Sequence, residues 1–304
     1  MRDFSVALSA AVLAGLLGAC GGGGSDPPPP STQFSNPELV TINNYSGHVM
    51  EPFISRDGGT LFFNDEGGPT DPTDKDLYYA TFIDATTFAY QGPLNINTAA
   101  VDGVPTMDDN GKFYYVSTID YDPPGNKFDT LYTGDWTGTT VDNPTVVAGL
   151  AVSAPGAVNF DLEVNPDGDT LYFIDGTFSG SAVPDSADIV IAVDSGGGFA
   201  RLLDSATILA NVNTSELEYA PAISRDGLEF FFTRLRTTPT LEAGIYRTRR
   251  SSTSSAFGVP ERITAIEGFV EGPTLSPDEK SLYYHRENPT TNKFELYRVT
   301  RPGK

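Results

Sequence analysis

One segment of this sequence occurs in several copies, and an acidic side chain lies shortly before each copy. The five acids are Glu51, Asp102, Asp161, Glu218 and Glu271. Carboxylates that converge on a narrow space repel each other, which raises some of their pKa values unless a cation neutralises them. Calcium suits such a site because it takes oxygen ligands. Two other interpretations stay open: each acid caps backbone N–H groups of a neighbouring element, or two of them act as acid and nucleophile or base in a hydrolysis.

Basic side chains gather in the last third of the sequence. They include Arg234, Arg236, His285 and Arg286. In a chain with 19 Lys and Arg against 40 Asp and Glu, this cluster predicts one basic sector beside the acids. Such a sector can bind a carboxylate or a phosphate through paired N–H donors. The alternative is that these cations pair with nearby acids on a solvated face.

Other signatures of catalysis are missing from the sequence. The two histidines, His48 and His285, show no metal-ligand spacing. No glycine-rich phosphate loop follows a strand, and no serine stands in a nucleophile elbow. We therefore assign no catalytic residue and favour a binding protein over an enzyme. The net charge of −21 argues against nucleic acid and anionic lipid surfaces as partners. We expect a monomer.

The elements that position these residues come from an internal repeat. An apolar run, a tight turn and an aromatic run recur five times, as in Ser55-Arg56-Asp57-Gly58 followed by Leu61-Phe62-Phe63. The equivalent turn positions are 57, 110, 167, 226 and 278, separated by 53, 57, 59 and 52 residues. Aspartate and glycine adopt such turn conformations at little cost. The five copies fill the chain from about residue 36 to its end.

Each copy predicts four short antiparallel strands, because a second pair of apolar segments follows each aromatic run. Four-stranded units at this period indicate an all-β protein, a β-propeller with five blades. A six-bladed ring is the alternative, although no sixth copy is evident. Residues 36–42 resemble 259–265, the outer strand of the fourth copy, whereas the fifth copy ends without one. We predict that the N-terminal segment supplies this missing strand and closes the ring.

The repeated phrases, such as Pro221-Ala222-Ile223-Ser224-Arg225-Asp226-Gly227, resemble the WD-repeat-like propeller repeats of TolB-type envelope proteins. The resemblance covers residues 36–304 and implies the fold. It says little about function, because that family is mostly a binding scaffold. Five-bladed propellers also carry glycoside hydrolases of the arabinanase and fructosidase type. In a hydrolase of that type, Asp161 with Glu271, or Glu51 with Glu218, would be the paired carboxylates.

The N-terminus predicts export and a lipid anchor. Residues 1–19 have the apolar core of a signal peptide but are short for a bilayer-spanning helix. Leu17-Gly18-Ala19-Cys20 resembles the bacterial lipobox, in which the cysteine is lipidated, and Cys20 is the only cysteine in the chain. Residues 20–35 are rich in glycine and proline, as expected of a tether. Gly21, in place of aspartate, favours the outer membrane.

Together these features predict an outer-membrane-anchored binding or scaffold propeller. Its loop-rich face would contact an envelope protein or a polysaccharide. The first alternative is a glycoside hydrolase-like propeller whose carboxylates lie at the channel mouth. The second is a purely structural propeller whose ring is clamped by calcium.

Overall fold

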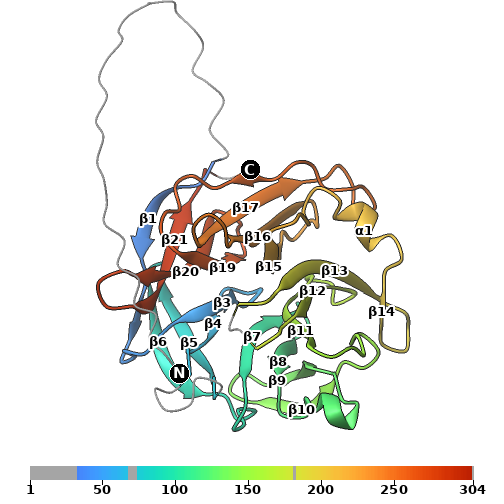
Figure 1. The fold of residues 1–304 in the computed structure, drawn as a ribbon. Helices are drawn as coiled ribbons and strands as arrows, with labels where there is room; N and C mark the ends of the chain where they lie inside the picture. Colours follow the sequence, from blue (N-terminus) through green and yellow to red (C-terminus); the bar gives the residue numbers. More distant parts are fainter. Residues whose placement is uncertain (1–32, 68–73, 181–182, 303–304) are drawn as a thin grey trace, which may run out of the picture. The chain divides into compact units, whose positions relative to one another are not determined.

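The computed structural model describes residues 33–67, 74–180 and 183–302. Five antiparallel sheets form the five blades of a β-propeller (Figure 1). The innermost strands are β3 (Met50–Ile54), β7 (Asp102–Met107), β11 (Ala157–Val164), β15 (Leu217–Ile223) and β19 (Val270–Leu275). The second strands are β4 (Thr60–Asn64), β8 (Lys112–Ser117), β12 (Thr170–Thr177), β16 (Glu229–Arg236) and β20 (Ser281–Asn288). The five blades confirm the prediction made from the repeat.

The outer half of each blade follows the same order. The third strands are β5 (Leu77–Asp84), β9 (Leu131–Trp136), β13 (Ser186–Asp194), β17 (Glu242–Arg249) and β21 (Lys293–Thr300). The outer strands are β6 (Thr87–Pro93), β10 (Val141–Val146), β14 (Phe199–Arg201), β18 (Glu261–Arg262) and β1 (Ser35–Leu39). One α-helical turn, α1 (Ser205–Ile208), and a 3-10 turn (Pro123–Gly125) lie in connections.

The ring is closed by the N-terminal strand, as the sequence predicted. Strand β1 pairs antiparallel with β21 and becomes the outer strand of the fifth blade. Phe34, just before it, is buried against Phe231 of the fourth blade, so the propeller includes residues that were assigned to the tether. The chain then forms β2 (Thr41–Asn43), which adds to blade 1 parallel to β6. That additional parallel strand was not predicted.

Hydrophobic cores fill the spaces between neighbouring blades. Each of five clusters of buried side chains joins two blades, and the cluster that joins the first to the last contains Leu61, Phe63, Tyr283 and Leu296. The aromatic run of every repeat supplies these side chains because alternate residues of a second strand face opposite neighbours. The repeat phrase is therefore mainly a packing signal.

The Asp-Gly turns and the loops lie at opposite ends of the ring. Second strands begin at the turns and run to the loop face, which we define by the described residues of the connections that follow them: 65–67, 74–76, 118–130, 178–180, 183–185, 237–241 and 289–292. At the turn end, Arg56 of blade 1 donates to Glu163 of blade 3 (Nη2–Oε1, 2.8 Å). Arg225 of blade 4 binds Asp109 of blade 2 (Nη1–Oδ2, 2.6 Å). These two arginines tie blades together across the channel.

The predicted signal peptide, Cys20 and residues 20–32 of the tether lie outside the described residues. Within the described part of the chain, we find no helix of the length and apolar character needed to cross a membrane.

Candidate functional site

The inner strands share one distortion that decides where the predicted acids lie. Each contains a β-bulge at a residue with positive φ, and these residues are Glu51, Val104, Asp161, Ala220 and Gly272. Only glycine adopts this conformation without strain, and bulges typically redirect a side chain. Proline follows the bulge in every blade except the third, where Leu162 stands. The five bulges therefore define equivalent positions around the channel.

The five acids occupy different positions relative to these bulges. Glu51 and Asp161 are bulge residues, Glu271 precedes its bulge by one residue, and Asp102 and Glu218 precede theirs by two. The inner strand thus places them at three levels rather than in one equivalent ring. The spacing in the sequence separates the same levels, because the acids lie six, seven or eight residues before their turn positions.

Asp102 and Glu218 stabilise turns within their own part of the chain. The Asp102 carboxylate accepts hydrogen bonds from the backbone N–H (2.5 Å) and the hydroxyl (2.7 Å) of Thr98. Glu218 does the same with Thr214 at 2.8 and 2.6 Å. Both side chains are fully buried. Their contacts are those of capping residues, one of the interpretations that the sequence left open.

Asp161 joins the third blade to the fourth. Its Oδ2 accepts a hydrogen bond from the backbone N–H of Ala220 at 2.9 Å. Burial raises the pKa of the Asp161 carboxyl well above its usual value, and the negative charges of Glu51 and Glu271 raise it further. Asp161 therefore holds its proton to higher pH than an ordinary aspartate.

Glu271 lies in the opposite electrostatic situation. Burial alone would raise its pKa, but hydrogen bonds from His285 and from the Tyr219 hydroxyl hold the pKa below its usual value. His285 is buried and links two blades, because its Nδ1 accepts the Glu51 N–H at 2.9 Å while its Nε2 lies 3.1 Å from Glu271 Oε2. The acceptor role of Nδ1 puts the ring proton on Nε2, which donates to Glu271.

The channel-mouth cluster of Glu51, Asp161, Glu271, Tyr219 and His285 thus combines residues from blades 1, 3, 4 and 5. Sequence reasoning found four of its members and missed Tyr219. A signal for this residue existed, since Tyr219 directly precedes the bulge of its strand, the position that Glu271 occupies in the next blade.

The predicted basic residues lie on second strands of the neighbouring blades 4 and 5, and each has its own contacts. Arg234 Nε binds Glu218 Oε1 at 2.6 Å, and the guanidinium stacks on Tyr246 with 4.7 Å to the ring centre. Arg236 lies on the surface near Glu216 and Glu242, at 3.7 and 3.5 Å. His285 belongs to the channel-mouth cluster. Arg286 stacks on Tyr297, with 3.7 Å between its guanidinium carbon and the ring centre. Ion pairing therefore accounts for Arg234 and Arg236.

The cavities along the channel are much smaller than the pocket on the loop face. The two cavities along the channel, one against Glu51 and Gly272 and one against Arg56 and Arg225, have volumes of about 20 Å³ each. A single water needs about 10–15 Å³ by this measure, so each holds about one water molecule. A pocket of about 200 Å³ lies on the loop face of blade 3, against Phe128 of blade 2. We call it the blade 3 pocket; sequence reasoning did not predict it.

Metal binding was tested against the same geometry. Across residues 33–67, 74–180 and 183–302, no group of three or more His, Cys, Asp or Glu side chains is arranged to hold a metal ion. Calcium at the channel mouth therefore stays a prediction that rests on the acids alone.

Comparison with known proteins supports the fold. No family model and no curated protein matches the sequence. Similar solved structures include a glycoside hydrolase (TM-score 0.60, 11% identity, 90% of this chain and 93% of that chain). A family 117 glycoside hydrolase from Zobellia galactanivorans aligns with a TM-score of 0.56 and 11% identity. The alignment covers 90% of this chain and 91% of that chain. TolB from Acinetobacter baumannii aligns with a TM-score of 0.47 and 14% identity. The alignment covers 85% of this chain and 56% of that chain. The two likenesses with TM-scores above 0.5, both to glycoside hydrolases, support the fold alone.

Proposed function

We propose that this propeller is a binding protein of the bacterial cell envelope, anchored by a lipid at Cys20. The observation that carries the proposal is the position of the blade 3 pocket. About 200 Å³ of space opens on the loop face, whereas each channel cavity offers about 20 Å³. Ligand sites are typically the larger concave spaces of a protein, and loops on a rigid scaffold commonly carry them.

Exposed apolar side chains on the same face support a macromolecular partner. Ile119 and Leu241 come from two of the connections that define the loop face, and Val152 comes from the connection 147–156 and lines the blade 3 pocket; they are 50%, 56% and 43% exposed, respectively. Such side chains supply binding energy when a partner covers them. The partner is another component of the envelope, either a protein or a polysaccharide.

A crosslinked pull-down from intact cells tests this proposal. The lipidated protein is compared with a loop-face variant, Ile119→Glu with Leu241→Glu. The matched control is Ile83→Glu, whose side chain is 52% exposed in the β5–β6 hairpin at the turn end. A partner that is retained by the control and lost from the loop-face variant supports the proposal. Recovery of the same set with all three baits overturns it. Cys20→Ser should release the protein from the membrane fraction.

A glycoside hydrolase is the second candidate, and one specific observation favours it. Asp161 has a raised pKa and Glu271 a lowered one, which is the inequality that an acid and a base or nucleophile require. Two similar structures also bear the name glycoside hydrolase. The channel cavity of about 20 Å³ leaves no room for a sugar ring in this conformation.

Hydrolysis of a panel of aryl glycosides tests that second candidate. If the enzyme reading holds, Asp161→Asn and Glu271→Gln should each lower activity at least about 100-fold, the range of a lost general acid or base. The matched control, Glu216→Gln, removes a half-buried acid near Arg236 and should retain activity. Absence of activity in the wild-type protein would remove this candidate.

A further inference from the structure

The blade 3 pocket has two chemically different sides. Phe128, Val152, Ala157 and Val158 form an apolar wall, and the ends of β12 and β13 supply polar groups. Among those groups, the hydroxyls of Thr177 and Ser186 bond to each other at 2.7 Å. The remaining polar groups are Asn159, Asp175 and Asp188. A ligand that fills this pocket therefore needs an apolar stem and a polar end.

The charges at the polar end do not balance. Asp175 is satisfied, because Arg201 binds its two oxygens at 2.7 Å each and Asn159 donates to Oδ1 at 2.7 Å. Asp188 stands directly opposite Asp175 in the β12–β13 pair. No hydrogen bond or ion pair joins the Asp188 carboxylate to any residue that the structure describes. Like charges directly opposite in a sheet repel each other, and the exposed Asp188 carboxylate gives the polar end of this pocket a net negative charge.

The charged groups around Asp188 do not neutralise it. Glu218 adds negative charge nearby and is itself bound by Arg234, while Arg201 is engaged with Asp175. Burial, Glu218 and Asp175 all raise the pKa of Asp188, as expected for an acid without a cationic partner. The net charge of −21 further disfavours an acidic ligand at this place.

We propose that the blade 3 pocket binds an arginine or lysine side chain presented by a protein partner, with its cation at Asp188. The alkyl stem of such a side chain packs along the apolar wall while its charged end pairs with the carboxylate. This inference rests on the proposed binding function and adds that the partner is a protein with a basic contact residue. It assigns no role to the channel-mouth acids.

The test uses the full chain and two matched probes, N-acetyl-arginine amide and its neutral counterpart N-acetyl-citrulline amide. We expect saturable binding of the arginine probe, at least tenfold weaker binding of the citrulline probe, and at least tenfold weaker binding of arginine to Asp188→Asn. The control is Asp194→Asn, which removes an exposed acid from the opposite end of the same strand β13. It should bind arginine as the wild type does.

Three outcomes overturn the inference. The first is no saturable binding of the arginine probe, and the second is equal binding to wild type and Asp188→Asn. The third is binding of glucosamine in preference to arginine, which would assign the pocket to an amino-sugar polymer. The pull-down distinguishes failure of the inference from failure of the proposed function. A partner that depends on the loop face but survives Asp188→Asn leaves the binding function standing and removes this site.

Discussion

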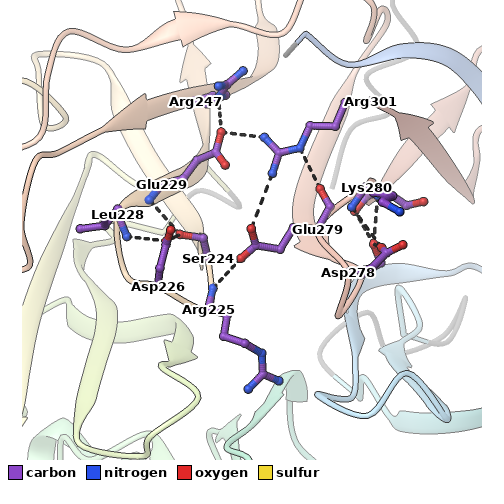
Figure 2. A network of polar contacts seen from close by, with 12 residues as sticks. Ser224, Arg225, Asp226, Leu228, Glu229, Arg247, Asp278, Glu279, Lys280 and Arg301 are labelled. Carbon is purple, nitrogen blue, oxygen red and sulfur yellow. Dashed lines mark hydrogen bonds and ion pairs between the residues drawn. The ribbon is translucent and has the colours of Figure 1, made fainter. Parts of the chain in front are cut away.

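Arg301, which directly follows β21, donates a hydrogen bond to Glu229 of the fourth blade, with 2.8 Å between Nη1 and Oε1 (Figure 2). Both side chains are almost fully buried. Arg301 also donates to the backbone carbonyl of Glu279 at 2.7 Å and covers the ring of Phe34 at 4.6 Å. One guanidinium thereby connects the fourth blade, the fifth blade and the N-terminal segment that closes the ring.

Arg301→Met should destabilise the propeller by about 3 kcal/mol, because removing one member of a buried ion pair leaves the other charge without its partner. Arg247 and Arg249 still pair with Glu229, which limits the loss. Urea unfolding at neutral pH measures the change. The matched control, Arg236→Met, removes an exposed arginine and should cost less than about 1 kcal/mol. Equal losses in both variants would contradict a closing role for Arg301.

The same pair predicts a pH dependence. Burial opposes ionisation of Glu229, but Arg301, Arg247 and Arg249 lower the pKa of Glu229 to about 2. A folded-state pKa below the unfolded value contributes stability that is present at neutral pH and lost as the pH falls. We therefore expect the stability gap between wild type and Arg301→Met to narrow between pH 4.5 and about 2. Urea unfolding at several pH values follows this gap; a gap that widens toward acid would refute the assignment.

Phe34→Ala should also loosen the closure. Phe34 is 4% exposed and contacts Phe231 edge to face, with 5.8 Å between ring centres. Truncation of a buried phenylalanine typically costs about 3–5 kcal/mol, and we expect the lower end because this side chain lies at the edge of the ring. Thermal unfolding checks the loss. Phe82→Ala, at a residue 48% exposed, serves as the control and should cost about 0.5 kcal/mol.

The fold was accessible from the sequence because its signals are local. Every blade is marked in the sequence by a tight turn between an apolar run and an aromatic run. The similarity of residues 36–42 to the outer strand of the fourth copy predicted how the ring closes. Strand β2 escaped prediction because its three residues pair in parallel with a distant segment, β6, and carry no repeat phrase.

The site was harder because the five acids do not share one position. Asp102 lies eight residues before its turn position and Asp161 six, and only the bulge, six residues before the turn in every blade, shows what that difference does to the direction of the side chains. The pairs Glu218–Arg234 and Glu271–His285 could nevertheless have been predicted from the sequence. Each pair is symmetric about its turn aspartate, at 226 and 278, and the strands do place the two members opposite each other. The blade 3 pocket depends on loop conformation, which no local pattern encodes.

Tyr284→Phe should stabilise the protein or leave it unchanged. The side chain is completely buried, and its hydroxyl has no hydrogen-bond partner among the described residues. Burial of an unpaired hydroxyl costs roughly 1–3 kcal/mol, so its removal should recover up to about 1 kcal/mol after repacking. Thermal unfolding at neutral pH measures the effect. Tyr219→Phe is the counterpart, since its hydroxyl bonds to Glu271, and this variant should be less stable than the wild type.

Asp161→Asn should raise stability at neutral pH while changing little in acid. The folded-state pKa of Asp161 lies well above 3.8, so below that pH the carboxyl is protonated in both the folded and the unfolded chain. As the pH rises, the unfolded chain ionises first, and the wild type loses stability until the folded-state pKa is reached. Asparagine cannot ionise, and its carbonyl oxygen can still accept the Ala220 N–H.

We therefore expect the melting temperature of Asp161→Asn to exceed that of the wild type by about 2–4 °C at neutral pH, the shift that ~1 kcal/mol causes in a large domain. The excess should vanish as the pH falls to about 4, near the ordinary aspartate pKa. Asp194→Asn, which removes an exposed acid, should follow the wild type at every pH. An excess of the same size at all pH values would show that packing, rather than a suppressed ionisation, distinguishes the variant. A pH-dependent excess would mean that the chain keeps a buried carboxyl at a cost in stability, as functional sites commonly do.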